Sequence, residues 1–195
     1  SPDWSEPDLN QPYLLYVGSA YPHKNLERLL EAWKIIAPRH AALTLVLAGE
    51  RDVFMRRLEE RVKASGHTQV RFFGRVSDEE LSRLYEQALA FVFPSRLEGV
   101  GLPPLEALAH GCPVAASDIP SLREVLGPTG AIFFNPESVN DIVRAVEAIL
   151  SDPAGVRVQA RRSVADLRER HAWRTAAEKT LAAYEKAISE LRITD

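Results

Sequence analysis

This sequence of 195 residues has a single cysteine, no excess of basic residues and no long apolar run. Cys112 is the only cysteine, which excludes an internal disulfide framework and a cysteine-rich metal site and is typical of a reducing compartment. No apolar run reaches the roughly 18–20 residues of a membrane-spanning helix, and the residues after Ser1 lack the basic and apolar regions that are typical of a signal peptide. The 24 basic residues are outnumbered by 27 acidic ones, giving a net charge of −3, which argues against nucleic acid as a partner.

Signature motifs of two large enzyme classes are missing as well. No G-x-G-x-x-G or P-loop pattern follows an apolar run, which disfavours a nicotinamide-dependent oxidoreductase and an NTPase. The five histidines show no spacing typical of metal ligands, so we expect no metal site. Cys112 lies in an apolar turn between a predicted helix and a predicted strand, where we expect it to be buried.

The sequence does contain a regular alternation of short apolar runs and amphipathic segments, in a composition typical of globular proteins. Strands are predicted at residues 13–17, 43–48, 70–73, 89–93, 113–116 and 131–134, and helices at 25–37, 53–65, 77 onward, 102–110 and 138–150. Asn25 and Ser77 are predicted to cap their helices, Ser77 together with Glu80 in a capping box. This order predicts an α/β, Rossmann-like three-layer domain with a mostly parallel sheet of about six strands.

Three segments are expected along the chain. Residues 1–11 are polar and rich in proline and are predicted to be a linker or arm. Residues 12–153 contain the alternating pattern and are expected to form the α/β domain, whereas residues 154–195 are predicted to form helices without a further strand. The last helix has one apolar face, made of Trp173, Ala177, Leu181, Tyr184, Ile188 and Leu191.

The densest chemical signal is the segment PSRLEGVGLPPLE at residues 94–106. Its two carboxylates, Glu98 and Glu106, are separated by seven residues in a loop that opens a predicted helix. Ligands of parallel sheets bind outside the carboxyl ends of the strands, where this loop is expected, and its glycines allow close approach of the backbone. Free amides at the helix start can bind an anion. Glu106 is expected in the first helical turn, where it can accept hydrogen bonds from a diol such as ribose. Taken alone, Glu106 would be interpreted as an acid favoured by the helix dipole and Glu98 as a solvated loop charge.

This segment resembles the E-x7-E region of retaining glycosyltransferases of the GT-B type, family 4, known as glycosyl transferases group 1. Further similar stretches lie at residues 16–19, 22–25, 47–50, 73–76, 107–118, 121–125 and 171–177. The resemblance covers roughly residues 11–191 and implies the C-terminal, donor-binding half of a GT-B fold.

The resemblance implies a role for each matching residue around a nucleotide-sugar donor. Glu98 would contact the hydroxyls of the donor sugar, and Glu106 would hold the ribose of the nucleotide. Backbone amides would bind the sugar and the diphosphate; they belong to Gly99, Val100, Gly101 and Leu102. Lys24 would neutralise the diphosphate, in agreement with its place after the first predicted strand, where an ammonium is a suitable point charge for phosphate.

The remaining donor contacts are expected in two other loops. Gly18 and Ser19 follow the first strand, and the backbone of Arg75 and Val76, after the third strand, would contact the base. Ser19 stands where many relatives have an arginine, so the diphosphate clamp is expected to be weaker or to use Arg75 or Arg96 instead. Val100 replaces the more common phenylalanine, which leaves the sugar specificity open.

The resemblance also implies a reaction and partners. The expected function is transfer of a hexose, with mannose a candidate, from a GDP-sugar or UDP-sugar to a glycan or lipid-linked acceptor, with retention and without a metal or other cofactor. The GT-B N-terminal domain is expected in the same or a separate chain, with the last helix docked on it, so the isolated chain would turn over little sugar. A cytoplasmic location is expected, with many relatives at the inner membrane surface.

Two other functions remain open at this point. The domain could keep the fold as a non-catalytic nucleotide-binding or interaction module, which the presence of Glu98, Glu106 and Lys24 argues against. It could also be a GT-B epimerase or hydrolase acting on nucleotide sugars, which is disfavoured because the motifs match those of transferases.

Overall fold

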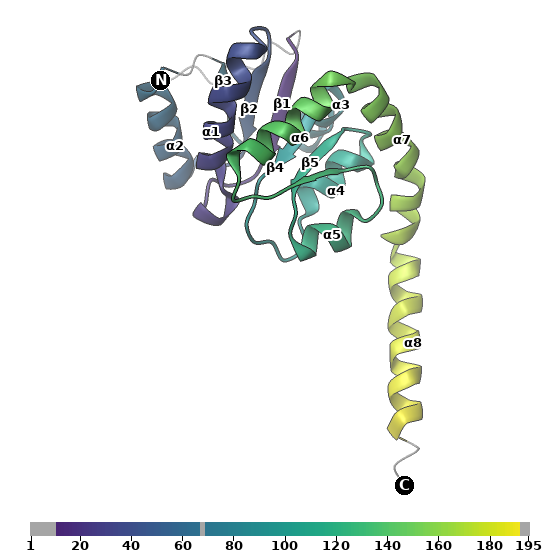
Figure 1. Cartoon of the computed structure of the whole chain (residues 1–195). Helices are drawn as coiled ribbons and strands as arrows, with labels where there is room; N and C mark the ends of the chain where they lie inside the picture. The colour runs from purple at the N-terminus through teal and green to yellow at the C-terminus, as the bar shows by residue number, and fades with distance from the viewer. Residues whose placement is uncertain (1–10, 67–68, 192–195) are drawn as a thin grey trace.

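A single parallel sheet organises the chain, of which a computed structural model describes residues 11–66 and 69–191 (Figure 1). The strands are β1 Tyr13–Val17, β2 Thr44–Ala48, β3 Val70–Phe73, β4 Ala90–Phe93, β5 Val114–Ser117 and β6 Ile132–Phe134. Their order in the sheet is β3-β2-β1-β4-β5-β6, and every neighbouring pair is parallel. The predicted Rossmann-like fold class is confirmed. Of the predicted linker at residues 1–11, all but Gln11 lies outside the described residues.

Helices cover both faces of this sheet. They are the 3-10 helices η1 Pro22–Lys24 and η2 Ala37–Arg39 and the α-helices α1 Leu26–Ile36, α2 Val53–Ala64, α3 Asp78–Gln87, α4 Leu102–Ala109, α5 Pro120–Leu126, α6 Val139–Ser151, α7 Pro153–Arg170 and α8 Trp173–Leu191. The chain crosses from β1 to β2 in one direction and from β4 to β5 in the other, so right-handed crossovers place α1 and α4 on opposite faces. On their respective faces, α1 packs against α6 and α4 against α7.

The strands consist of short apolar runs because both faces of the sheet are covered. All four residues of β4 and all four of β5 are buried. Trp33 on the inner face of α1 is fully buried, as the helical period of apolar residues predicts. Cys112 is buried as well, and burial raises the pKa of its thiol to about 12. The predicted strand bounds differ from the observed ones by at most one residue at each end.

The helix caps give one confirmed and one incorrect prediction. Ser77 and Glu80 form the predicted capping box: Ser77 N donates to Glu80 Oε2 at 2.7 Å, and Glu80 N donates to Ser77 Oγ at 3.3 Å. Asn25 precedes α1 but its side chain makes no capping hydrogen bond, so the predicted cap is wrong. Its backbone is left-handed, with φ of 60°, and its amide group points to other loops instead.

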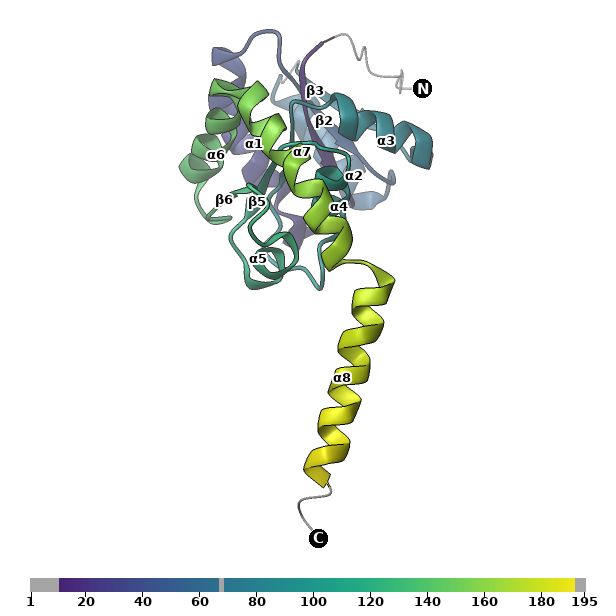
Figure 2. The ribbon, with the colours of Figure 1, turned by 90° about the vertical axis from the view of Figure 1, so that its right-hand side faces the viewer.

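Helix α8 extends away from the α/β domain, as Figures 1 and 2 show from two directions. None of the described side chains between Trp173 and Glu190 is buried. By contrast, α7 packs on the domain through Ala160 and Leu167, which are 3% and 2% exposed. The two C-terminal helices therefore differ: α7 belongs to the core of the domain, and α8 has no packing partner among the described residues.

Candidate functional site

The site lies at the carboxyl edge of the sheet, where β1 and β4 are neighbours and the order of strands reverses. Chains leaving these two strands turn to opposite faces, and this opens a crevice in which ligands of such sheets bind. The loop after β1 contains Lys24, and the loop after β4 contains Glu98. Their side chains meet there: Lys24 Nζ lies 2.7 Å from Glu98 Oε1. Two predicted site residues, 74 positions apart, are thus brought into direct contact.

This ion pair is largely shielded from solvent. The side chains of Lys24 and Glu98 are only 17% and 10% exposed, and the ammonium lies 5.5 Å from the centre of the Phe93 ring, in a cation–π contact. Each charge compensates the other in a poorly hydrated place, where an unpaired charge would be costly. The pair therefore places one ammonium group next to one carboxylate in the crevice.

Tyr16, a residue that sequence reasoning did not assign to the site, supports the loop after β1. Its hydroxyl donates to the carbonyl oxygen of Ser19 at 2.7 Å. Burial, assisted by the charge of Glu98, raises the pKa of Tyr16 far above its usual value, so the phenol remains a neutral donor. Gly18 has φ of 146°, and a Cβ there would lie 2.8 Å from the Tyr16 hydroxyl oxygen. The close approach of ring and loop thus requires glycine at this position.

The loop between β4 and α4 presents unpaired backbone amides. In the described part of the chain, no hydrogen bond is donated by the amides of Gly99, Val100, Gly101 and Leu102. Gly101 precedes α4 with φ of 79°, and a Cβ on it would come within 2.4 Å of Leu122 Cδ2. Glycine therefore permits the tight entry into α4, and the free amides at the helix start can bind an anion.

Glu106 lies further along α4 than predicted. The helix begins at Leu102 and has no acidic residue in its first turn, so Glu106 is its fifth residue and starts the second turn. The helix starts at Leu102 as predicted, but four residues precede Glu106 within it, so the prediction of a first-turn position is wrong. The carboxylate is exposed on one side and accepts a hydrogen bond from the Tyr85 hydroxyl at 3.2 Å on the other. Tyr85 is a site residue that sequence reasoning missed.

The predicted base contacts lie in the loop after β3. Arg75 is exposed and Val76 is half-buried, directly before the capping box that starts α3. Since β3 is separated from β1 by β2, this loop lies to one side of the Lys24–Glu98 pair on the same edge. Ser19 is half-buried and offers its backbone carbonyl to Tyr16.

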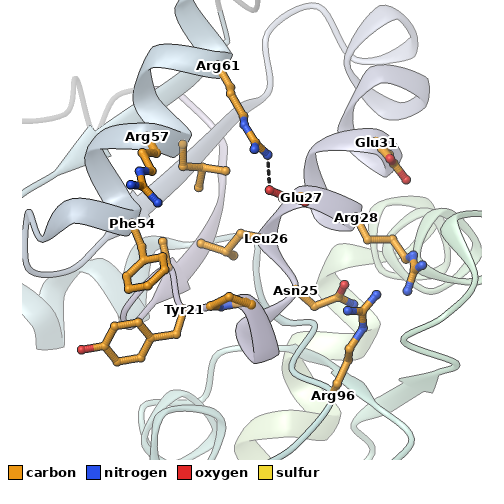
Figure 3. A pocket seen from close by; sticks show the side chains of 13 residues that line it. Tyr21, Asn25, Leu26, Glu27, Arg28, Glu31, Phe54, Arg57, Arg61 and Arg96 are labelled. Carbon is orange, nitrogen blue, oxygen red and sulfur yellow. Dashed lines mark hydrogen bonds and ion pairs between the residues drawn. The ribbon is translucent and has the colours of Figure 1, made fainter.

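A cavity of about 340 Å³ opens beside the loop after β1, between α1 and α2 (Figure 3). Tyr21 and Phe54 meet edge to face at one side of it, with ring centres 5.0 Å apart, and Arg61 of α2 is paired with Glu27 of α1. Lys24, Glu98 and Glu106 do not line it. The cavity thus adjoins the predicted site through the loop after β1 and Arg96 but does not include these three side chains.

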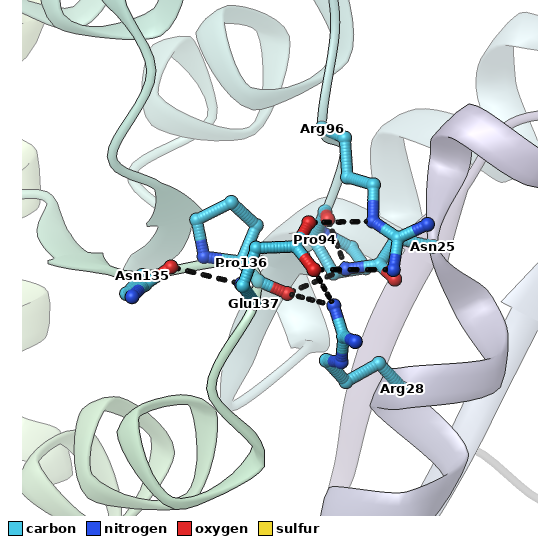
Figure 4. Close-up of polar contacts among 7 residues, drawn as sticks. All are labelled: Asn25, Arg28, Pro94, Arg96, Asn135, Pro136 and Glu137. Atoms are coloured by element: carbon cyan, nitrogen blue, oxygen red, sulfur yellow. Dashed lines mark hydrogen bonds and ion pairs between the residues drawn. The ribbon is translucent and has the colours of Figure 1, made fainter.

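A polar network joins three loops of the carboxyl edge (Figure 4). The amide nitrogen of Asn25 donates to the carbonyl oxygens of Pro94 at 3.0 Å and Pro136 at 2.8 Å, and this side chain is buried. The loops after β1, β4 and β6 are thereby connected next to the Lys24–Glu98 pair. The left-handed backbone of Asn25, rare for residues other than glycine, aims its amide away from α1 and into the loops.

Glu137 completes the network with two arginines. Arg28 bonds to both the Pro136 carbonyl and Glu137, and Arg96 Nε lies 2.7 Å from Glu137 Oε1. The pKa of Glu137 is lowered, mainly by the hydrogen bond from Arg28 and also by the charges of both arginines. Arg96 is therefore engaged here, whereas Arg75 has no ion-pair partner among the described residues.

Within residues 11–66 and 69–191, no three His, Cys, Asp or Glu side chains are grouped so that they could hold a metal ion. No described helix is both long and apolar enough to cross a bilayer.

Comparison with known sequences gives one family and several relatives. The family described as glycosyl transferases group 1 matches residues 3–179. The chain is 35% identical over 179 residues to O-antigen chain mannosyltransferase B of Escherichia coli, covering 89% of this chain and 46% of that protein. It is 35% identical over 144 residues to O-antigen chain mannosyltransferase RfbU of Salmonella typhimurium, covering 74% and 40%. The chain thus spans less than half the length of these relatives.

Solved structures with the same arrangement are also found. A sucrose-phosphate synthase from Thermosynechococcus elongatus is 28% identical, with a TM-score of 0.78, over 93% of this chain and 47% of that one. Anabaena HepE, solved with UDP and glucose, has a TM-score of 0.77 at 17% identity, over 91% of this chain and 49% of that one. The second likeness concerns the fold alone.

Proposed function

Because the chain belongs to the glycosyl transferases group 1 family, we propose that it is the nucleotide-sugar-binding half of a retaining glycosyltransferase. The observation that supports this most directly is the shielded Lys24–Glu98 pair next to the free amides of the loop before α4. A cation, a helix start and a carboxylate at one edge of a parallel sheet suit a ligand that joins a diphosphate to a polyhydroxyl sugar.

Each site residue then has a distinct part in binding the donor. Lys24 and the amides of residues 99–102 bind the diphosphate, with Gly18 and Ser19 forming the wall of the loop after β1. Glu98 accepts hydrogen bonds from the sugar hydroxyls. Glu106 accepts them from the ribose, and the backbone of Arg75 and Val76 contacts the base.

Transfer proceeds at the anomeric carbon of the bound sugar. The acceptor hydroxyl attacks on the face from which the nucleoside diphosphate leaves; the bond from carbon to the phosphate oxygen breaks as the bond to the acceptor oxygen forms. The proton of the acceptor passes to the departing phosphate, and the charge that develops there is stabilised by Lys24 and the loop amides. Glu98 orients the sugar, and the scheme requires no metal.

The substrates follow from the relatives and from the chemistry of the site. Mannosyltransferases are among the most similar curated proteins, so we propose a hexose, with mannose first, carried by GDP or UDP. The acceptor is a glycan or a lipid-linked glycan. We propose a cytoplasmic reaction, with attachment to the inner membrane surface where the acceptor is lipid-linked.

The partner that completes the site is an N-terminal GT-B domain, in the same or a separate chain. Exposed large apolar side chains lie in the loops after β1 and β4, at the starts of α2 and α4, and on α8: Tyr21, Leu97 and Val100, Val53, Phe54 and Leu102, and Trp173, Leu181, Tyr184 and Ile188. Groups of this kind are typical of surfaces that another protein covers. Since the chain spans less than half of its relatives, we propose that both surfaces contact that domain, and that turnover is low without it.

Thermal shift with UDP, GDP and ADP tests the donor site directly. We expect one of the three, at millimolar concentration, to raise the melting temperature of the 195-residue chain. Glu106→Gln should reduce this shift because an amide accepts hydrogen bonds from the ribose more weakly than a carboxylate. Glu178→Gln, a change of the same kind on exposed α8, is the control and should leave the shift unchanged. Absence of any shift with all three nucleotides would contradict the proposal.

A further inference from the structure

Tyr85 is a buried tyrosine whose hydroxyl group reaches the proposed ribose-binding carboxylate. It lies on α3 and is 1% exposed. Its hydroxyl oxygen is 3.2 Å from Glu106 Oε2 on α4. Tyr85 thus connects α3, which follows the predicted base contacts, with α4, which contains the proposed ribose contact Glu106.

The ring of Tyr85 is held in place from two sides. It stacks on His110, with ring centres 5.7 Å apart, and meets Phe91 edge to face at 5.6 Å. With the ring fixed in this way, the hydroxyl group has a defined direction. A hydrogen bond from a fixed donor selects one rotamer of the otherwise flexible glutamate side chain.

The chemistry of the pair makes Tyr85 the donor and Glu106 the acceptor. Burial, followed by the charge of Glu106 and the hydrogen bond to it, raises the pKa of Tyr85 well above the usual value of a phenol. The phenol therefore keeps its proton under ordinary conditions. An ionised carboxylate accepts hydrogen bonds at both oxygens, so Tyr85 engages Oε2 and leaves Oε1 for a ligand.

We propose that Tyr85 is a positioning residue that orients Glu106 toward the two hydroxyls of the nucleotide ribose. This inference rests on the proposed function of the site. It assigns a role to a residue that does not contact the donor and that acts only through the Glu106 carboxylate. The role also explains why a polar aromatic residue, and not phenylalanine, occupies a buried position on α3.

The test compares nucleotides with and without the ribose diol. Affinities of wild type and Tyr85→Phe for UDP, GDP and ADP, and for their 2′,3′-dideoxy counterparts, are measured by calorimetric titration. We expect Tyr85→Phe to weaken binding of the preferred ribonucleotide about three- to tenfold, the range of one hydrogen bond. Binding of its dideoxy counterpart should change less than about twofold, because the Glu106 carboxylate that Tyr85 orients then finds no ribose hydroxyls to bind.

Tyr13→Phe is the matched control. The Tyr13 hydroxyl is also buried and donates to the same helix, at Leu84 O on α3, 2.8 Å away. Its loss therefore removes a buried hydroxyl next to Tyr85 but keeps the bond from Tyr85 to Glu106. This variant should bind both nucleotides as wild type does, and urea unfolding of both variants verifies that they fold. In the double variant Tyr85→Phe/Glu106→Gln, binding should equal that of Glu106→Gln alone.

Three results would overturn the inference. Unchanged ribonucleotide affinity in Tyr85→Phe would show that the hydrogen bond does not matter for binding. Equal losses for the ribo and dideoxy forms would show a general structural role. If wild type binds none of the ribonucleotides, the proposed function itself fails and the positioning role with it, a result distinct from the other two.

Discussion

At the scale of single residues, Lys24 and Glu98 determine both the chemistry of the crevice and part of its stability. Their charges lie 2.7 Å apart and are mostly shielded from solvent. If one partner is removed, the other remains as an uncompensated charge in a poorly hydrated place. The cost is then set by desolvation of the remaining charge and not by the strength of the pair itself.

We predict that Lys24→Met lowers the free energy of unfolding by about 1–3 kcal/mol, because Glu98 is left without a partner. The double variant Lys24→Met/Glu98→Gln should recover most of this lost stability but should still fail to bind the nucleoside diphosphate. Urea unfolding and calorimetric titration measure the two effects. Arg174→Met, which removes an exposed pair with Glu178 on α8, is the control and should change stability by less than about 0.5 kcal/mol.

A stability of the double variant no better than that of Lys24→Met would contradict this account. In that case the side chain of Lys24 would contribute through its contact with Phe93 and not through its charge on Glu98.

The residue scale also shows where a local rule fails. Asparagine before an amphipathic helix predicts a cap, yet Asn25 bonds to the carbonyl oxygens of Pro94 and Pro136, which lie 69 and 111 positions away. The local rule considers only the nearest amides, whereas the fold offers two buried carbonyl groups that need a donor. Satisfying those groups outweighs one helix cap.

At the scale of elements, α3 starts at a capping box and supplies Tyr85 to the site. Ser77 Oγ and the Glu80 carboxylate each accept a hydrogen bond from the backbone of the other residue. The bonds to Ser77 lower the pKa of Glu80. A carboxylate with a lowered pKa in the folded state stabilises the protein above its usual pKa, and this contribution is lost as the pH falls through the folded value.

We predict that Ser77→Ala lowers the free energy of unfolding by about 0.5–2 kcal/mol at pH 7, the usual cost of losing a cap. Glu80→Gln should give a smaller decrease of stability between pH 5 and pH 3 than wild type shows. Urea unfolding across this pH range measures both effects. Glu79→Gln removes the neighbouring first-turn acid and is the control for the helix dipole. If the stability of Glu79→Gln changes with pH in the same way as that of Glu80→Gln, the helix dipole and not the capping box causes the pH dependence.

At the scale of the whole molecule, the two C-terminal helices have different relations to the domain. Helix α7 packs against α4, the helix that contains Glu106, and its Leu167 is 2% exposed. Helix α8 extends from the domain, as both views show (Figures 1 and 2), and its Trp173 is 92% exposed. Stability of the domain should therefore depend on α7 and not on α8.

We predict that a chain ending at residue 172 unfolds within about 3 °C of the full chain and binds nucleotide equally well, since it loses little buried surface. Leu167→Ala in the full chain should cost about 2–4 kcal/mol because it leaves a cavity where α7 packs on the domain. Calorimetric melting measures both. A large fall in melting temperature on removal of α8 would mean that α8 packs on the domain in solution.

The sequence by itself determined the α/β class, the approximate strand and helix bounds and the segments that supply Lys24, Glu98 and Glu106. These features follow from the period of apolar residues, from glycines at strand ends and from short motifs, all of which are local in the chain. The family resemblance added roles for the same residues. Domain bounds, donor contacts and the reaction itself remain predictions.

Only the tertiary structure decided how these residues are supported. The contact of Lys24 with Glu98, the bond from Tyr85 to Glu106 and the network around Asn25 and Glu137 all join loops or helices that are distant in the chain. No local pattern encodes such pairs, because they form only after the parallel sheet brings the carboxyl ends of its strands to one edge. The same reason explains α8, whose apolar face can be recognised in the sequence but whose exposure depends on what the rest of the fold leaves uncovered.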